Sequence, residues 1–303
     1  MGGPPIQARC LDARPPATYR LGIVDVSRAL LTDKVAIVTG AGRGIGKGVA
    51  LAFADFGAKV VVCERREPYL SEVVEAIRSR GGSALASETD VRDADQVRAM
   101  VERAVAEFGS VDVLVNNVGG IYTGRDHPAP LPFLETSEES WDASHELNLK
   151  TVYLCTSEVG KAMVGQGRGG SIINVSSSEA LRGAPGFATY GAYKAAITAL
   201  TKTLALELAP HNVRVNCIAP DGIATEWIVQ SMAQAGPSSW PWGHIPMGRA
   251  ATPEEAAGAF VFLASELSSF VTGVTLPLDG GIIAASGWVR DANGTWSVAR
   301  GES

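Results

Sequence analysis

The feature of this chain that most constrains its fold is an alternation of short apolar runs with longer helical patterns, which begins at Lys34. Strands that alternate with helices are typical of βαβ units, in which parallel strands form a buried sheet. The runs that predict strands are KVAIVTG, AKVVVC, SALASE, VDVLVNN, GSIINVS, NVRVNCIAP and GVTLPLDGG. We therefore expect an α/β fold, a doubly wound parallel sheet with helices on both faces.

Helical patterns fill the segments between these runs. They cover Gly44 to Phe56, stretches that end at Arg80 and Phe108, Ser144 to Met163 and Phe187 to Leu208. The run TPEEAAGAFVFLAS opens a last helix, with Thr252 as N-cap and Glu255 placed to complete a capping box. We expect a flexible extension over residues 1–30, one domain over 31–283 and a tail over 284–303.

Composition and charge exclude several classes of protein. A formal charge of −6 leaves no basic stripe for a nucleic acid. No apolar run is long enough for a membrane helix, and no signal-peptide pattern opens the chain. The four cysteines and four histidines lack the spacing of a metal site or a C-x-x-C pair. These features predict a cytoplasmic protein with a small-molecule substrate and no metal.

A glycine-rich turn, TGAGRGIGKG, joins the first strand to the first helix. Its backbone N–H groups and the helix dipole would face a phosphate. The turn is not a nucleotide-triphosphate loop, because Ala41 replaces the first glycine and Gly48 stands where a hydroxyl would bind Mg²⁺. A purely structural turn is the alternative. Glu64, at the end of the second strand, favours a dinucleotide, since its carboxylate can accept hydrogen bonds from a ribose.

Two tyrosines precede one lysine in the run YGAYK at 190–194. On a helix Tyr190 and Lys194 are i and i+4 and share a face, whereas Tyr193 points about 100° away from its neighbour Lys194. A nearby ammonium favours the phenolate form of a tyrosine. We therefore expect Tyr190 to be the acid/base of the pair; the alternative is an ordinary helix-surface pair.

These motifs occur together and in order, with NNVG at 116–119, Asn148 and the serine cluster Ser176–Ser178, and the chain resembles the short-chain dehydrogenase/reductase family over Leu31 to about Ile283. The resemblance implies an NAD(P)-binding Rossmann fold. It also implies the catalytic residues Asn148, Ser177, Tyr190 and Lys194. The cofactor-binding residues that it implies are Gly40, Arg43, Gly44, Ile45, Gly46, Glu64, Asp90, Val91, Asn117, Gly119, Tyr190, Lys194, Pro220, Gly222, Ile223 and Thr225.

Within the serine cluster the family's spacing of thirteen residues before Tyr190 selects Ser177, whose hydroxyl would bind the reacting oxygen. Ser176 and Ser178 would point to the other side if the strand direction persists. The resemblance also gives Asn148 a role in anchoring a water that relays protons through Lys194; a buried structural amide is the alternative.

The choice of cofactor depends on charges near the second strand. Glu64 would repel a 2′-phosphate, while Arg43 and Arg65 could bind one. We expect NAD, with NADP as the alternative, because the carboxylate occupies the strand-end position. The sequence departs from the family at Asp221, where Pro-Gly is usual; aspartate tolerates a left-handed backbone, so we expect the turn to persist.

The segment from Trp227 to Gly248 contains no Asp, Glu, Lys or Arg and carries Trp240 and Trp242. It predicts an apolar lid over a neutral, hydrophobic or cyclic substrate, or else packing against the body or another subunit. We expect an oxidoreductase acting on a secondary alcohol or ketone. The alternatives are an NADPH-dependent 3-oxoacyl thioester reductase and a non-enzymatic dinucleotide sensor. The resemblance implies a homo-oligomer, a tetramer or dimer.

Overall fold

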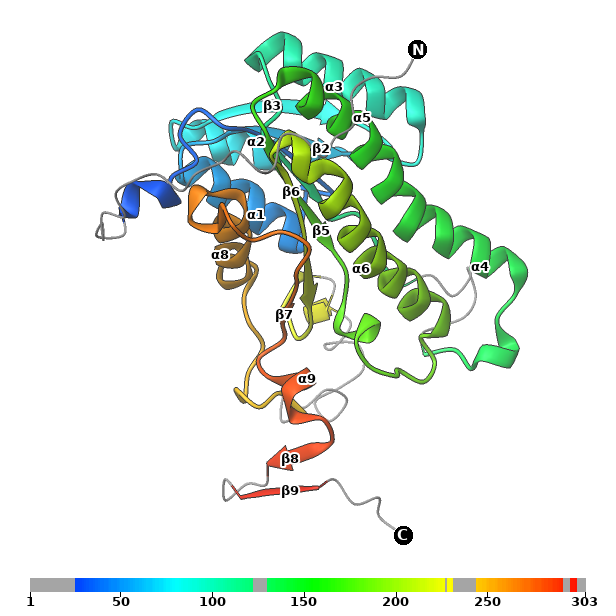
Figure 1. Ribbon diagram of the computed structural model, residues 1–303. Helices are drawn as coiled ribbons and strands as arrows, with labels where there is room; N and C mark the ends of the chain where they lie inside the picture. The colour runs from blue at the N-terminus through cyan, green and yellow to red at the C-terminus, as the bar shows by residue number, and fades with distance from the viewer. Residues whose placement is uncertain (1–24, 122–129, 227, 231–243, 291–294, 299–303) are drawn as a thin grey trace, which may run out of the picture.

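The computed structural model describes residues 25–121, 130–226, 228–230, 244–290 and 295–298. A parallel sheet forms its centre, with the strand order β3-β2-β1-β4-β5-β6-β7 (Figure 1). The strands are β1 (Val35–Thr39), β2 (Lys59–Glu64), β3 (Ser83–Glu88), β4 (Val113–Asn116), β5 (Gly170–Val175), β6 (Val213–Pro220) and β7 (Thr275–Leu278). The predicted doubly wound fold is confirmed, with every strand pair of this sheet parallel.

Strand β1 lies between β2 and β4. Strands β2 and β3 are added on one side of β1, and β4 to β7 are added on the other side, so the direction of the connections reverses at β1. In an open parallel sheet this reversal separates the loops that follow the two strands and leaves a crevice at their carboxyl ends. The glycine-rich turn follows β1, so the fold places it at that crevice.

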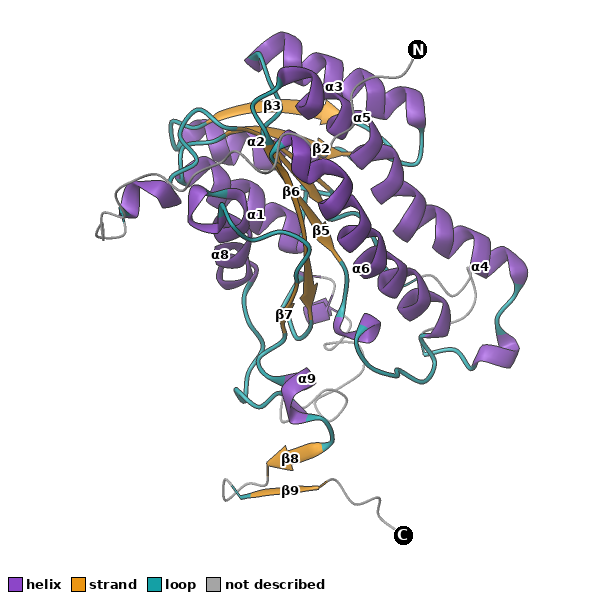
Figure 2. Cartoon of the chain, in the orientation of Figure 1, coloured by secondary structure: helices purple, strands orange, loops and turns teal. Residues whose placement is uncertain are grey.

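Helices cover both faces of the sheet (Figure 2). The described helices are α1 (Gly44–Asp55), α2 (Tyr69–Ser79), α3 (Ala94–Phe108), α4 (Glu138–His145), α5 (Thr151–Gln166), α6 (Ala188–Leu208), α8 (Pro253–Ala264) and the short α9 (Ile282–Ala285), which lies beyond the end of β7 (Figure 2). Side chains alternate between the two layers: Ala36 and Val38 pack with α1, α2 and α8, while Val35 and Ile37 pack with α3, α5 and α6. This period of two explains why nearly continuous apolar runs form these strands.

The starting points of two helices can be compared with those predicted from the sequence. Helix α8 begins with the predicted capping box, in which Thr252 Oγ1 accepts from Glu255 N at 3.2 Å and Glu255 Oε2 accepts from Thr252 N at 3.0 Å. The helix predicted from Ser144 begins earlier, because α4, a π-helical turn η4 (Glu146–Lys150) and α5 follow one another without a break. The π-helical turn carries Asn148.

Short 3-10 turns complete the described elements: η2 (Val26–Ala29), η3 (Phe133–Glu135), η5 (Ser178–Ala180), η6 (Ala209–His211) and η8 (Glu266–Ser268). The first of them lies inside the expected extension, and Arg28 Nη2 donates to Glu266 O at 2.8 Å. Within the expected tail, β8 (Trp288–Arg290) and β9 (Trp296–Val298) form an antiparallel hairpin away from the sheet (Figure 1). No helix of the described residues is long and apolar enough to cross a membrane.

Candidate active site

A cavity of about 1050 Å³ lies at the carboxyl ends of β1 to β6. The loops that follow these strands line it, as expected for an open parallel sheet. The predicted residues that line it are Gly40, Arg43, Gly44, Ile45, Glu64, Asp90, Val91, Asn117, Gly119, Ser177, Tyr190, Lys194, Pro220, Gly222, Ile223 and Thr225. Of the predicted residues only Gly46 and Asn148 are not part of its lining.

The glycine-rich turn shapes the floor of this cavity. Gly40 and Gly44 have φ values of +62° and +54°, a left-handed backbone that favours glycine. Gly46 lies behind the turn, where a Cβ atom would overlap the carbonyl oxygen of Gly40. Gly46 therefore allows α1 to approach the turn closely, and its contribution to a ligand site is indirect.

A carboxylate that the sequence did not predict lies at the N-terminus of α1. Glu226 Oε2 accepts a hydrogen bond from Gly44 N at 2.8 Å, and Glu226 lines the cavity. The first N–H groups of a helix have no partner within the helix and attract anions. Glu226 thus occupies, in this structure, the place where the sequence predicts a phosphate.

The end of the cavity near β2 and β3 carries charges of both signs. Glu64 is buried, and its Oε1 accepts from Arg65 N at 3.0 Å and lies 3.6 Å from Arg66 Nε. Arg92 binds Asp90 through two nitrogens, and this hydrogen bonding lowers the pKa of Asp90 to about 2. Two carboxylates therefore line this end of the cavity, each with an arginine beside it.

Tyr190, Lys194 and Ser177 meet at the opposite wall. Lys194 Nζ lies 5.6 Å from the centre of the Tyr190 ring and donates to the Val175 carbonyl at 3.0 Å. Burial lowers the pKa of Lys194 to about 8 and raises the pKa of Tyr190 to about 12, although a hydrogen bond with Ser177 opposes the second shift. Burial is the largest cause of the raised pKa of Tyr190, and the carboxylates of Glu179 and Asp221 raise it further.

Tyr193 lies on a different face of α6, as the helical spacing predicts. Its ring packs 5.0 Å from Trp141 and 5.5 Å from His145, and only 7% of the residue is exposed. It does not line the cavity. Tyr190 and Tyr193 thus differ in environment while sharing one helix.

Asn148 is fully buried beneath the loop that follows β4. Its side-chain amide makes two hydrogen bonds to the backbone of Gly120: Oδ1 accepts from Gly120 N at 3.0 Å, and Nδ2 donates to Gly120 O at 2.9 Å. A Cβ on Gly119 would lie 2.7 Å from Lys194 Nζ and 2.9 Å from Asn148 Oδ1. Asn148 therefore fixes the loop that forms the cavity wall beside Lys194, as expected for a buried structural amide. Its role in a proton relay through Lys194 stays a prediction.

The serine cluster does not alternate as expected. β5 ends at Val175, and Ser177 then caps the turn η5, so Ser178 comes round to the same polar cluster as Ser177. Ser176 points to the other side and donates to the Lys194 carbonyl at 2.7 Å.

The residues that follow Ser177 form a charged cluster that the sequence did not predict. Glu179 accepts from Ser177 Oγ and, at 3.2 Å, from Ser178 Oγ. Arg182 Nη2 donates to Glu179 Oε1 at 3.2 Å and to Asp221 Oδ2 at 2.9 Å, and Ser178 shares its one proton between Asp221 and Glu179. The left-handed residue of the Pro-Asp turn is Gly222, at φ +60°, so aspartate fits at 221 without strain.

The predicted lid lies mostly outside the described residues, and Trp227, Trp240 and Trp242 are among those not described. At its edges Ile228 and His244 line the cavity. The described cysteines, Cys63, Cys155 and Cys217, are buried and free.

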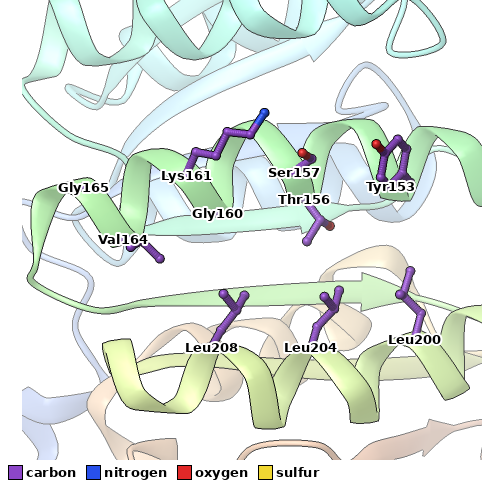
Figure 3. Close-up of a pocket in the computed structure, with 10 residues that line it drawn as sticks. All are labelled: Tyr153, Thr156, Ser157, Gly160, Lys161, Val164, Gly165, Leu200, Leu204 and Leu208. Atoms are coloured by element: carbon purple, nitrogen blue, oxygen red, sulfur yellow. The ribbon is translucent and has the colours of Figure 1, made fainter. Parts of the chain in front are cut away.

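A second hollow of about 560 Å³ lies between α5 and α6 (Figure 3). Leu200, Leu204 and Leu208 project into it from α6, opposite Tyr153 and Val164 of α5. Tyr153 is 61% exposed. This groove is a mainly apolar surface on the outside of the helical layer.

Comparison with known proteins gives a consistent picture. Residues 40–283 match the family model described as "Enoyl-(Acyl carrier protein) reductase". The chain is 40% identical to a 3-oxoacyl-(acyl-carrier-protein) reductase of Chlamydia muridarum, over 84% of this chain and 99% of the relative. It is 39% identical to 2-dehydro-3-deoxy-D-gluconate 5-dehydrogenase of Escherichia coli, over 84% of this chain and 97% of the relative.

Solved structures agree with these sequence relatives. A 7 alpha-hydroxysteroid dehydrogenase complexed with NADH and 7-oxo glycochenodeoxycholic acid superimposes with a TM-score of 0.78, at 33% identity, over 86% of this chain and 98% of that chain. A short-chain type dehydrogenase/reductase from Mycobacterium marinum superimposes with a TM-score of 0.76, at 36% identity, over 84% and 98% of the two chains.

Proposed function

This chain belongs to the short-chain dehydrogenase/reductase family and is an NAD(P)-dependent oxidoreductase, and on that premise we propose that Tyr190 is its acid/base in the oxidation of a secondary alcohol or the reduction of a ketone. The observation that carries the proposal is the meeting of Tyr190, Lys194 and Ser177 on one wall of the cavity whose floor is the glycine-rich turn. Residues 31–283 would form the catalytic domain.

The cofactor accepts or supplies the hydride when it is bound. The chain's own residues handle the proton. Tyr190 would take it from a substrate hydroxyl or return it to a carbonyl oxygen, and Ser177 would hold that oxygen beside Tyr190. Lys194 lies close enough to favour the phenolate once the cofactor's positive charge adds to its own. Asn148 would support this arrangement through the loop at Gly120.

The positions of the acidic side chains favour NAD over NADP. Glu64 ends β2 inside the cavity, where its carboxylate would face the adenosine ribose and meet a 2′-phosphate directly. Arg65 lies 3.7 Å from Asp90 and Arg66 3.6 Å from Glu64, so neighbouring carboxylates already offset both cations. Arg43 would be the remaining cation nearest to a 2′-phosphate.

The similarity to a 3-oxoacyl-(acyl-carrier-protein) reductase makes a carrier-bound thioester the second candidate substrate. Docking an acidic carrier would need free cations at the substrate end of the cavity. Of the cations described at that wall, Lys194 is buried and donates to the Val175 carbonyl, and Arg182 is bound by Glu179 and Asp221. We therefore favour a free, neutral alcohol or ketone, with a cytoplasmic enzyme acting on it.

We further propose that the enzyme is a homo-oligomer in which the groove between α5 and α6 packs against a second copy. Tyr153, at the edge of the groove, is 61% exposed, Leu200, Leu204 and Leu208 line it, and an apolar groove of this kind gains free energy when it is covered. Light scattering should give a dimer or tetramer. A charge in the groove, Leu204→Asp, should reduce the mass to that of a monomer.

The two tyrosines of α6 provide the test of the catalytic assignment. Tyr190→Phe should keep the fold and NAD⁺ affinity and lose at least about a hundredfold in kcat, the scale expected for a positioned acid/base group. Tyr193→Phe is the matched control and should change kcat by only a few-fold, because its hydroxyl lies outside the cavity. Equal or reversed losses would show that Tyr190 is not the acid/base. The assay is NADH formation with secondary alcohols, and melting curves check the fold.

A further inference from the structure

We propose that Glu179 is a specificity-determining residue that selects substrates with a second hydroxyl group on the carbon next to the reacting one, that is, vicinal diols or the corresponding hydroxy ketones. The inference rests on the proposed function, since it concerns the same cavity. It depends on one contact, the hydrogen bond from Ser177 to Glu179.

A serine hydroxyl has one proton to donate. In this structure Ser177 donates that proton to Glu179 Oε2, and its oxygen accepts a hydrogen bond from Glu179 N at 3.4 Å. A substrate oxygen that needs a donor from Ser177, as a carbonyl or a developing alkoxide does, must therefore compete with Glu179. In this structure the hydroxyl proton of Ser177 is already used in the hydrogen bond to Glu179.

Glu179 cannot simply turn away from Ser177. Its other oxygen, Oε1, is bound by Arg182 at 3.2 Å, and Arg182 is itself fixed by Asp221 at 2.9 Å. The Glu179 side chain is only 19% exposed, and hydrogen bonding from Ser177 and Arg182 outweighs desolvation to lower its pKa. Glu179 is thus an ionised carboxylate held in place, with Oε2 facing Ser177.

When Ser177 turns to the reacting oxygen, Glu179 Oε2 loses that hydrogen bond, and Ser178 Oγ, which lies 3.2 Å from the same oxygen, shares its one proton with Asp221. A buried acceptor left without its donor is costly. A second hydroxyl on the substrate can replace the lost donor. Oxygens on adjacent carbons are about one hydrogen-bond length apart, as Ser177 Oγ and Glu179 Oε2 are, so both can be reached at once.

The reaction itself stays balanced. The carbon that carries the reacting hydroxyl loses its hydrogen as hydride to NAD⁺, the hydroxyl proton passes to Tyr190, and a carbonyl forms. The neighbouring hydroxyl donates its hydrogen bond to Glu179 throughout and is not changed. The product of a diol is therefore a hydroxy ketone, and the reverse reaction starts from it.

The cluster also selects against negative charge. Glu179 and Asp221 carry two charges of one sign against the single cation Arg182. A substrate carboxylate placed beside the reacting carbon would meet this excess, and Arg182, the cation of the cluster, is already bound by both carboxylates. We therefore expect neutral diols to be preferred to hydroxy acids.

The experiment compares substrates that differ by one hydroxyl: cyclohexane-1,2-diol with cyclohexanol, and butane-2,3-diol with butan-2-ol. NADH formation gives kcat/KM for each. The wild type should prefer the diol of a pair at least tenfold. Glu179→Ala should raise kcat/KM for the mono-alcohol, because Ser177 is released, and lower it for the diol, so that the preference falls below about threefold.

Two further variants separate selection from simple damage. Glu266→Ala removes an exposed glutamate far from the cavity and should leave the tenfold preference unchanged. Glu179→Gln keeps the shape of the side chain and removes its charge, so we expect a preference for the diol between those of the wild type and Glu179→Ala. If Glu179→Ala does not fold, the glutamine variant takes its place in the comparison. A merely structural Glu179 would lower kcat/KM for both substrates of a pair by the same factor.

The outcomes are distinguishable. Equal use of diols and mono-alcohols by the wild type would overturn the role of Glu179 and leave the proposed function standing. Turnover of neither class by a protein that binds NAD⁺ would also overturn it. Failure to bind NAD⁺ or NADP⁺ at all would instead contradict the proposed function.

Discussion

Removing the carboxylate of Glu226 should tighten the binding of NAD⁺. Glu226 Oε2 accepts from Gly44 N at 2.8 Å, at the first turn of α1, where the dinucleotide's pyrophosphate would bind. The cofactor must displace this carboxylate before its phosphates reach the same N–H group. A side chain that competes for a site lowers the apparent affinity of the ligand by the free energy of its own contact.

The magnitude follows from that contact. A net hydrogen bond to a charged group is worth about 1.5–3 kcal/mol, and a carboxylate at a helix N-terminus about 0.3–1 kcal/mol. Glu226 is exposed, so water screens its charge and the lower values apply. We take about 1 kcal/mol, which corresponds to roughly a fivefold decrease in the Kd of NAD⁺ for Glu226→Ala.

Quenching of protein fluorescence by NAD⁺ measures this change directly, without any substrate. Glu254→Ala is the matched control, since Glu254 lies in the first turn of α8 and does not line the cavity. Inorganic pyrophosphate should also bind the Glu226→Ala variant more tightly. Unchanged or weaker NAD⁺ binding by this variant would refute the reasoning, because Glu226 would then not compete for the phosphate position.

Three further outcomes are expected. The wild type should bind NAD⁺ at least tenfold more tightly than NADP⁺, and Glu64→Ser should narrow or reverse this preference in the same titration; tighter NADP⁺ binding by the wild type would contradict it. Burial lowers the pKa of Lys194 from 10.5 to about 8. Between these pH values the unfolded chain binds one more proton than the folded chain, so the free energy of unfolding should rise as the pH increases. Denaturant unfolding at pH 8 and pH 10 should therefore show a gain of roughly 2 kcal/mol relative to Lys194→Met, and no difference in slope would exclude a buried lysine. Gly46→Ala should lower the melting temperature and the NAD⁺ affinity, since its Cβ would overlap the Gly40 carbonyl, whereas Gly258→Ala, with open space around it, should do neither.

The sequence by itself determined the features that depend on local periodicity. Apolar runs buried on both faces predict parallel strands, and the structure has them in one sheet. The capping box at Thr252 was predicted because both of its partners lie within one helical turn. Helical spacing also placed Tyr190 beside Lys194 and Tyr193 on a different face of the helix, where it meets Trp141.

The tertiary structure alone decided the contacts that join distant parts of the chain. Glu226 reaches Gly44 across 182 positions, and Asp221 meets Ser178 across 43, separations at which no periodicity carries information. The π-helical turn at Asn148 and the end of β5 before Ser177 changed the directions in which neighbouring side chains point. Burial raises the pKa of Tyr190 to about 12, and no single sequence segment predicts this shift because burial depends on all the elements packed around the side chain.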